Sequence, residues 1–286
     1  VHDPEVFTKK ETTRIVQIDP VKDIRDLQLF FPISGTRDMY QSKPGRQMGF
    51  ILGHEGKGSL LSFLKEKGWA TSLSAGAGSD TKEYGRASVK IGLTEQGLKD
   101  YEEVLMATVD YIRLMKSAGY QEHVFNELKT MAELEYVYGA KGEGMWRATQ
   151  LANEAMMYPL ENVGKINYMY NDKNPKSYED LLEQLELNNM LVVVTAKGVS
   201  TDQLEYYYNA PYSYKEDKPL YSLLLEKREN KKLKIPEVNP FIPTTASVPN
   251  RDIIDNKLPR LLSSDLGHEL YSVSYTHLTL PTKVTG

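Results

Sequence analysis

The chain has 286 residues, of which 40% are hydrophobic and 26% charged, an ordinary composition for one large or two modest globular domains. Its formal net charge of −4 argues against a nucleic-acid partner, because phosphate binding requires a clustered basic surface. The lack of Cys excludes disulfides and cysteine-based metal sites, and no apolar run approaches the roughly 20 residues that span a bilayer, so we expect no membrane partner.

Alternating polar and apolar residues predict two strands near the start of the chain, over residues 14–18 and 25–32. Residues 44–52 predict a short helix that begins with a proline. A glycine-rich turn, Gly53–Ser59, follows and leads into an amphipathic helix over residues 60–67. We expect the rest of the chain to be the frame that holds this turn.

Gly68 is expected to end that helix, and residues 69–75 predict a strand in which large and small side chains alternate. A flexible run is expected over residues 76–79. Residues 84–93 alternate strictly and predict the clearest strand in the chain, with one face in water. A single long helix is expected over residues 94–117.

Further helices are predicted over residues 121–138 and 146–158, separated by a glycine-bearing loop, and another is expected to begin at Ser177. The continuous apolar run 190–196 predicts a strand buried on both faces. This order of elements predicts an α+β fold in which helices pack on one face of a mainly antiparallel sheet.

Two later segments are distinguished by composition. Residues 206–214 are rich in Tyr and contain Pro211, which is expected to stop the run; such a run can line a peptide-binding cavity, but we favour packing at a domain boundary. From Lys231 onward, prolines punctuate a segment with little periodicity, which predicts an extended interdomain linker.

Two His-Glu pairs, at positions 54–55 and 268–269, resemble the start of the zinc-binding motif His-Glu-x-x-His. Gly58 and Ser272 occupy the positions at which the second His is required. No pair among the five His has ligand spacing, so the sequence predicts no metal site within this chain.

The Gly53–Ser59 turn has the glycine spacing of a P-loop, but Ser59 stands where the Lys is required. No Gly-x-Ser-x-Gly element surrounds any Ser. The turn therefore has two interpretations. Either it is a tight turn in which Ser59 caps the next helix, or it binds a peptide that pairs with the backbone of residues 69–75 while the Glu55 carboxylate attracts its α-amino group.

The run Leu52–Leu61, followed by Leu64-Lys65-x-Lys67-Gly68-Trp69, closely resembles the insulinase–pitrilysin (M16) family of zinc metalloendopeptidases. Three further segments match that family, and the resemblance covers most of residues 1–270; the segments are residues 93–98, 158–161 and 239–244. The resemblance implies the LuxS/processing-peptidase-like metallohydrolase fold. It also implies a protein of homologous α+β domains that form two halves around a chamber, with the zinc motif His-x-x-Glu-His in the first domain.

By this resemblance, residues 1–235 are a non-catalytic second domain, residues 236–265 an interdomain linker, and residues 266–271 the start of a third domain. Zinc is then a cofactor of the full-length protein and not of this segment. Residues 272–286 have no family counterpart and look like translated sequencing-adapter DNA, so we expect a non-native tail.

In the insulin-degrading branch of the family, the second domain holds an exosite that anchors the substrate's N-terminus away from the zinc. This chain carries Ala75 where that branch has glycine. The residues that match the exosite are Gly53, His54 and Glu55 in the turn and Leu73, Ser74 and Ala75 in the strand.

The expected function is therefore that of a substrate-anchoring, non-catalytic segment of a zinc-dependent metalloendopeptidase that degrades peptides. Its expected partners are peptide substrates, the upstream catalytic domain and the C-terminal half of the same protein. Two alternatives stay open: a structural core-type subunit that shares the fold without peptidase activity, and a peptide-binding module that acts alone.

Overall fold

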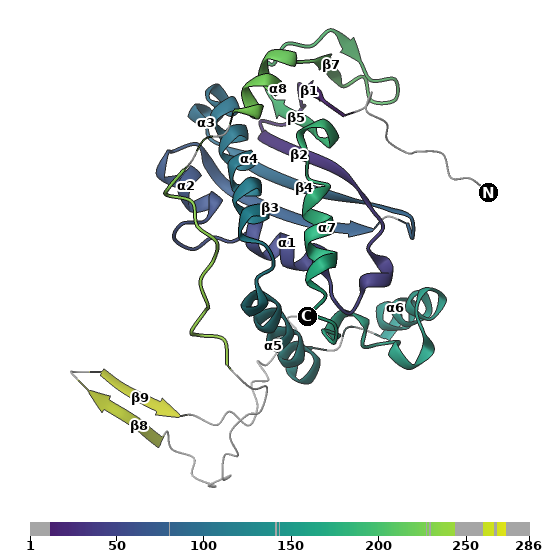
Figure 1. The fold of residues 1–286 in the computed structure, drawn as a ribbon, viewed down its shortest axis with the longest axis vertical. Coiled ribbons are helices and arrows are strands. Elements are labelled where there is room, and N and C mark those ends of the chain that lie inside the picture. The colour runs from purple at the N-terminus through teal and green to yellow at the C-terminus, as the bar shows by residue number, and fades with distance from the viewer. Residues whose placement is uncertain are drawn as a thin grey trace, which may run out of the picture. The chain divides into compact units, whose positions relative to one another are not determined.

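The computed structural model describes residues 12–79, 81–140, 142, 144–226, 228, 230–243, 260–265 and 268–272 (Figure 1). The chain divides into two compact units, Val1–Ala246 and Ser247–Gly286. The described residues of the second unit form an antiparallel hairpin of β8 (Arg260–Asp265) and β9 (His268–Ser272). Strand β8 lies in the segment that the sequence predicts to be linker, and residues 273–286 of the expected tail lie outside the described residues.

The first unit is built on a seven-stranded sheet with the order β3-β4-β2-β5-β1-β7-β6. Its neighbouring strands are antiparallel except for β1 and β5, which are parallel. The strands are β1 (Arg14–Ile18), β2 (Arg25–Ser34), β3 (Ala70–Ser79), β4 (Tyr84–Leu93), β5 (Leu191–Ala196), β6 (Gln203–Leu204) and β7 (Pro211–Glu216). The predicted α+β fold with a mainly antiparallel sheet is confirmed.

Helices cover one face of this sheet, and Figure 1 shows α4 and α7 lying across it. The α-helices are α1 (Pro44–Leu52), α2 (Leu60–Glu66), α3 (Glu95–Lys99), α4 (Tyr101–Ala118), α5 (Glu122–Tyr138), α6 (Gly144–Met157), α7 (Pro175–Glu183) and α8 (Lys218–Leu225). Short 3-10 helices are η1 (Arg37–Met39), η2 (Leu160–Asn162), η3 (Ile166–Tyr168) and η4 (Leu187–Asn189).

The core lies between the sheet and these helices. Leu27, Leu29 and Phe31 on β2 point into it and are at most 2% exposed, as their shared face predicts. Strand β5 pairs with β2 on one side and β1 on the other, and Val192 to Val194 are buried in succession. The prediction of a strand buried on both faces is therefore confirmed.

The long helix expected over residues 94–117 is two helices, so that prediction is wrong at one point. The break is at Asp100, whose φ of −104° and ψ of 26° separate α3 from α4. The Asp100 carboxylate accepts hydrogen bonds from the Trp69 indole at 2.9 Å and from Gln96 at 2.7 Å. Because a side chain in the break binds a residue distant in sequence, periodicity alone does not reveal it.

The flexible run expected over residues 76–79 is also wrong, because β3 continues through it to Ser79. Gly76, Ala77 and Gly78 each pair with a residue of β4. Their small side chains lower strand propensity, but the ladder with β4 and a close contact with α1 hold the segment in an extended conformation.

Tyr206, Tyr207 and Tyr208 are each at least 80% exposed, and the Tyr206 and Tyr207 rings meet edge to face with their centroids 5.1 Å apart. Pro211 does not simply stop the run, since it begins β7. No helix in the described residues is both long and apolar enough to cross a membrane.

The first part of the proline-rich segment is fixed to the helical layer. Leu233 is buried, and the Lys234 carbonyl accepts a hydrogen bond from the Tyr111 hydroxyl at 3.1 Å. The amide of Asn239 donates to the Glu127 carboxylate at 2.8 Å. Residues 233–239 therefore follow the surface of the first unit rather than leaving it as a free linker.

Candidate functional site

The glycine-rich turn is held by its own hydrogen bonds and by the segment after α8. Ser59 caps α2, since its hydroxyl accepts from the Ser62 amide at 3.1 Å, which confirms the predicted cap. Gly58 has a φ of +85°, and its carbonyl accepts from the Lys234 amide at 2.8 Å. The His54 imidazole accepts from the Gly56 amide at 3.1 Å, so this ring is engaged within the turn.

The structure brings part of the predicted site together. A Cβ added to Gly53, at the end of α1, would lie 3.7 Å from the Ala75 amide nitrogen, so the turn begins against the middle of β3. The side chains of Glu55 and Ser74 are exposed. Leu73 is only 8% exposed and belongs to the core, so only its backbone is available to a ligand.

Strand β3 lies at one end of the sheet, opposite β6, and no described strand pairs with its outer edge. Helix α1 lies beside the second half of β3. A Cβ added to Gly45 would lie 2.4 Å from the Ala77 carbonyl oxygen, and one added to Gly49 would lie 2.9 Å from that of Ala75. Glycine at these positions, one helical turn apart, lets the helix touch the strand. The edge is thus bordered by α1 over residues 75–77.

A polar cleft of about 650 Å³ lies where α1 begins, and sequence reasoning missed it. The basic residues Arg37, Lys43 and Arg46 line it, together with Ala77 and Gly78 of β3. The signal in the sequence was weak, because three basic residues spread over ten positions resemble an ordinary solvated surface. Only the turn before α1 gathers them around one cavity.

Lys43 is the most constrained of these residues. Its backbone is left-handed, with a φ of 46°, and its ammonium donates to the Ile166 carbonyl at 2.6 Å. The same ammonium stands 5.3 Å from the centre of the Tyr170 ring. Burial, with a smaller contribution from Arg46, lowers the pKa of Lys43 to about 8.

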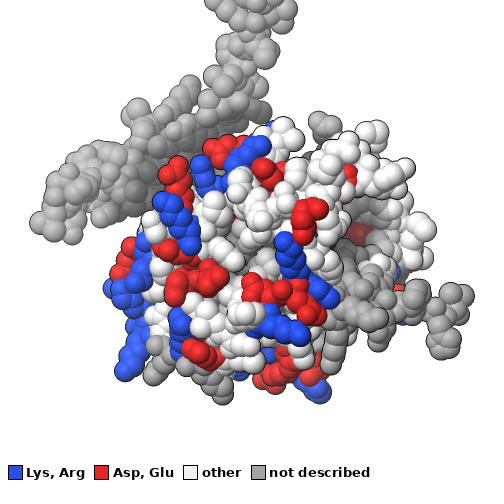
Figure 2. All heavy atoms as spheres, turned by 90° about the horizontal axis from the view of Figure 1, so that it is seen from above, with Lys and Arg blue, Asp and Glu red and all other residues white. Residues whose placement is uncertain are grey.

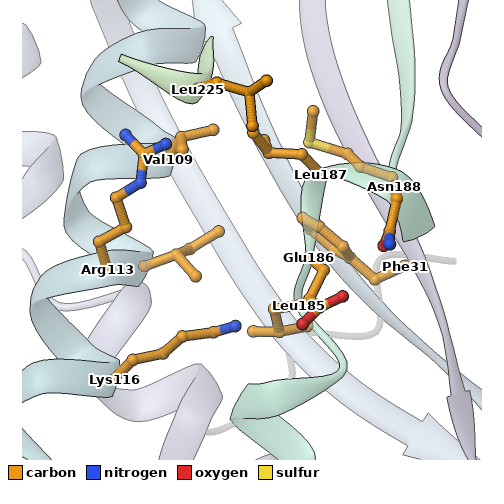
Figure 3. Close-up of a pocket in the computed structure, with 11 residues that line it drawn as sticks. Phe31, Val109, Arg113, Lys116, Leu185, Glu186, Leu187, Asn188 and Leu225 are labelled. Atoms are coloured by element: carbon orange, nitrogen blue, oxygen red, sulfur yellow. The ribbon is translucent and has the colours of Figure 1, made fainter. Parts of the chain in front are cut away.

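A second cavity, of about 310 Å³, lies between α4 and the segment that joins α7 to β5 (Figure 3). Its wall is mainly apolar, with Phe31 and Met190 among the lining residues. In Figure 3, side chains of α4 face residues 185–188 across the cavity. Arg113 at its rim is engaged by the Asp110 carboxylate at 3.0 Å and by the Glu226 carbonyl at 3.1 Å, and the charged side chains of Lys116 and Glu186 also line the cavity.

The face seen in Figure 2 carries Lys and Arg interspersed with Asp and Glu. That face therefore offers no extended basic surface of the kind that binds nucleic acid. Within the described residues, no three His, Asp or Glu side chains are grouped so as to hold a metal ion. His123, for example, contacts the Pro236 carbonyl at 2.9 Å. The described residues therefore do not fit a zinc centre.

Two family models cover almost the whole chain. The model for the peptidase M16 inactive domain matches residues 2–132, and the model for the middle or third domain of peptidase M16 matches residues 136–279. The chain belongs to the peptidase M16 family. What it contains of that family is non-catalytic: the inactive domain and residues matching the middle domain.

M16 relatives are much longer than this chain. Human insulin-degrading enzyme is 31% identical over 248 residues, which are 85% of this chain and 24% of the enzyme. A protein of Schizosaccharomyces pombe with the words zinc protease in its name is 30% identical over 264 residues, covering 91% of this chain and 27% of that protein. The crystal structure of pitrilysin superposes with a TM-score of 0.82 at 20% identity, over 93% of this chain and 28% of that one. The chain thus spans about a quarter of the length of these M16 proteins and has the fold of the matching part of pitrilysin.

Proposed function

We propose that this chain is the substrate-anchoring, non-catalytic segment of a zinc-dependent M16 metalloendopeptidase that degrades peptides. The observation that carries the proposal is that no described strand pairs with the outer edge of β3, and that this edge lies beside the turn that ends α1. An edge strand presents unpaired backbone N–H and C=O groups, and an extended peptide satisfies them by adding a strand.

In this proposal five of the six predicted residues have a role, while the sixth, His54, accepts a hydrogen bond from the Gly56 amide within the turn. Gly53 is the residue at which the turn lies against Ala75, and Glu55 places an exposed carboxylate on that turn. A peptide with a free N-terminus brings an ammonium group that this carboxylate attracts. Alternate residues of the segment Leu73–Ala75 supply the backbone hydrogen bonds, while the Leu73 side chain anchors the strand in the core.

The same proposal extends to the whole protein. In this proposal residues 1–235 are the second domain, residues 236–265 the linker and residues 266–271 the start of a third domain. The complete domains have the LuxS/processing-peptidase-like metallohydrolase fold. Zinc, the catalytic domain and the C-terminal half belong to the remainder of the full-length protein. This segment holds the far end of the peptide and raises its residence time near the metal.

The test is equilibrium binding of one unstructured peptide to the 286-residue chain, with its N-terminus either free or acetylated. We expect the free form to bind about two- to fivefold more tightly, the range for an exposed ion pair. Glu55→Gln should remove that preference, whereas Glu102→Gln, which changes an exposed carboxylate on α4, should keep it.

A second variant tests the backbone contact. Ala75→Trp places a large side chain against the turn and should weaken both peptide forms about tenfold, because it blocks the strand edge. Ala152→Trp, at an exposed position of α6, is the matched control. Equal binding of both peptides to every variant, or no binding to the unmodified chain, would remove the proposal.

A further inference from the structure

The basic cleft at the start of α1 lacks the counter-charges that basic side chains usually have. Within the described residues, neither Arg37 nor Arg46 is in a salt bridge. The acids near the cleft are engaged elsewhere: Asp38 pairs with Lys82 at 3.5 Å, and Glu154 accepts from the Gly164 amide at 2.6 Å and from Gln150. Three cations therefore line one cavity with no acidic side chain among its lining residues.

A comparison of two helix starts within the chain shows that Lys43 is less favourable for folding stability at its position than another residue would be. Helices α1 and α7 start in the same way, with a left-handed residue followed by proline. At α7 this residue is Asn174, which adopts the conformation readily and caps the helix by accepting from the Ser177 amide at 3.1 Å. At α1 it is Lys43, and no side chain caps the helix. A residue that costs stability in this way often marks a functional position.

The cleft also lies in line with the proposed peptide edge. Ala77 and Gly78 of β3 form part of its wall, whereas Ala75 faces the turn. Helix α1 begins to border the edge of β3 at Ala75, so a paired peptide leaves the strand there. Three residues of extended chain span about 10 Å, so the peptide beyond that point reaches the cleft within about three residues.

We propose that this cleft binds a carboxylate of the peptide that pairs along β3, so that the site selects peptides with acidic residues a few positions from the paired end. This inference rests on the proposed function, which supplies the bound peptide. The preference for acidic residues follows from the basic side chains of the cleft. An incoming carboxylate meets two guanidinium groups that form no salt bridge within the described residues, and also the Lys43 ammonium. Guanidinium groups bind carboxylates through paired N–H donors. Binding an anion also offsets the cost of holding Lys43 away from water.

The experiment compares two peptides that differ only at positions four and five from a free N-terminus, with Glu in one and Gln in the other. Binding of each to the 286-residue chain is measured by calorimetry at low and moderate salt. We expect the Glu peptide to bind about tenfold more tightly at low salt and this preference to shrink as salt rises. The double variant Arg37→Gln/Arg46→Gln should bind both peptides equally.

The control variant, Lys65→Gln/Lys99→Gln, loses the same net charge from exposed positions outside the cleft and should keep the preference. Inorganic phosphate is the second arm, because a free oxyanion has similar chemistry. If phosphate competes with the Glu peptide only, at millimolar concentration, a shared anion site is supported. If phosphate binds but the two peptides bind alike, the cleft is a free-anion site and the peptide assignment is wrong.

The outcomes also separate the two proposals. Equal binding of the Glu and Gln peptides, with no effect of the double variant, overturns the carboxylate site and leaves peptide pairing intact. Absence of binding by either peptide overturns the proposed function, and the peptide carboxylate assignment falls with it.

Discussion

Replacing Lys43 by Asn is expected to stabilise the folded chain at pH 7, although it removes a cation from the cleft. Asn adopts the left-handed conformation more easily than Lys, which relieves about 1 kcal/mol of strain. Its side chain can cap α1 as Asn174 caps α7, for about another 1 kcal/mol. The hydrogen bond from the Lys43 ammonium to the Ile166 carbonyl is lost, at about 1 kcal/mol. The net gain is about 1 kcal/mol, or about 2–4 °C in melting temperature.

The gain should depend on pH. The pKa of Lys43 is about 8 in the folded chain and 10.5 when unperturbed, so between these values the unfolded chain holds the extra proton. The free energy of unfolding of the unmodified chain therefore rises with pH across that window, while that of Lys43→Asn lacks this contribution. The advantage of Asn is fully present below pH 8, is lost as the pH rises above 8, and is reversed before pH 10.5, because this pKa shift outweighs a gain of about 1 kcal/mol.

The assay is urea denaturation followed by circular dichroism at several pH values from 7 to 10. Lys43→Gln serves as the control, because it removes the charge without the cap or the relief of strain. Asn174→Lys is the reciprocal change and should cost about 1–2 kcal/mol. The reasoning is refuted if Lys43→Asn is less stable than the unmodified chain at pH 7, or if the difference between the two is the same at every pH.

Three further changes test how the fold holds the site. Gly97→Ala should destabilise the chain by about 3 kcal/mol in urea denaturation, because its Cβ would lie 1.8 Å from the Trp69 carbonyl oxygen; a cost below about 1 kcal/mol would contradict this contact. Gly45→Ala should cost about 2 kcal/mol, since its Cβ would lie 2.4 Å from the Ala77 carbonyl oxygen, whereas Gly76→Ala on the neighbouring strand meets nothing within 4 Å and should cost much less. Tyr111→Phe should cost about 1 kcal/mol and hasten proteolysis of residues 233–239, because it deprives the Lys234 carbonyl of its donor; unchanged proteolysis would show that the segment is held by its other contacts.

The local pattern of apolar, polar and glycine residues was enough to place most helices and strands and the glycine-rich turn of the candidate site. In β4 every second residue is buried, and in β5 successive residues are buried. Both patterns can be seen directly in the order of apolar residues in the sequence. The cap at Ser59 and the stop at Gly68, with its φ of +72°, are likewise set by neighbouring residues. The family resemblance rested on the same stretch and supplied the six positions that we propose as an exosite.

The features that pattern could not provide are contacts between distant residues. The break at Asp100 depends on an indole 31 positions earlier, and the extension of β3 depends on its ladder with β4. The basic cleft requires the turn before α1, the end of β3 and the segment near Ile166 to meet. Local conformational propensity does not determine contacts between distant segments, so no short stretch of the sequence predicts this cleft.

The sequence by itself determined the class of fold, the family and the turn with its capped helix, because these follow from periodic burial and short-range hydrogen bonds. The tertiary structure alone decided that β3 is an edge strand, that Gly53 lies against Ala75 and that three cations share one cavity. The physical reason is that strand order and charge clustering are set by packing between elements far apart in the chain, where each contact depends on all the others.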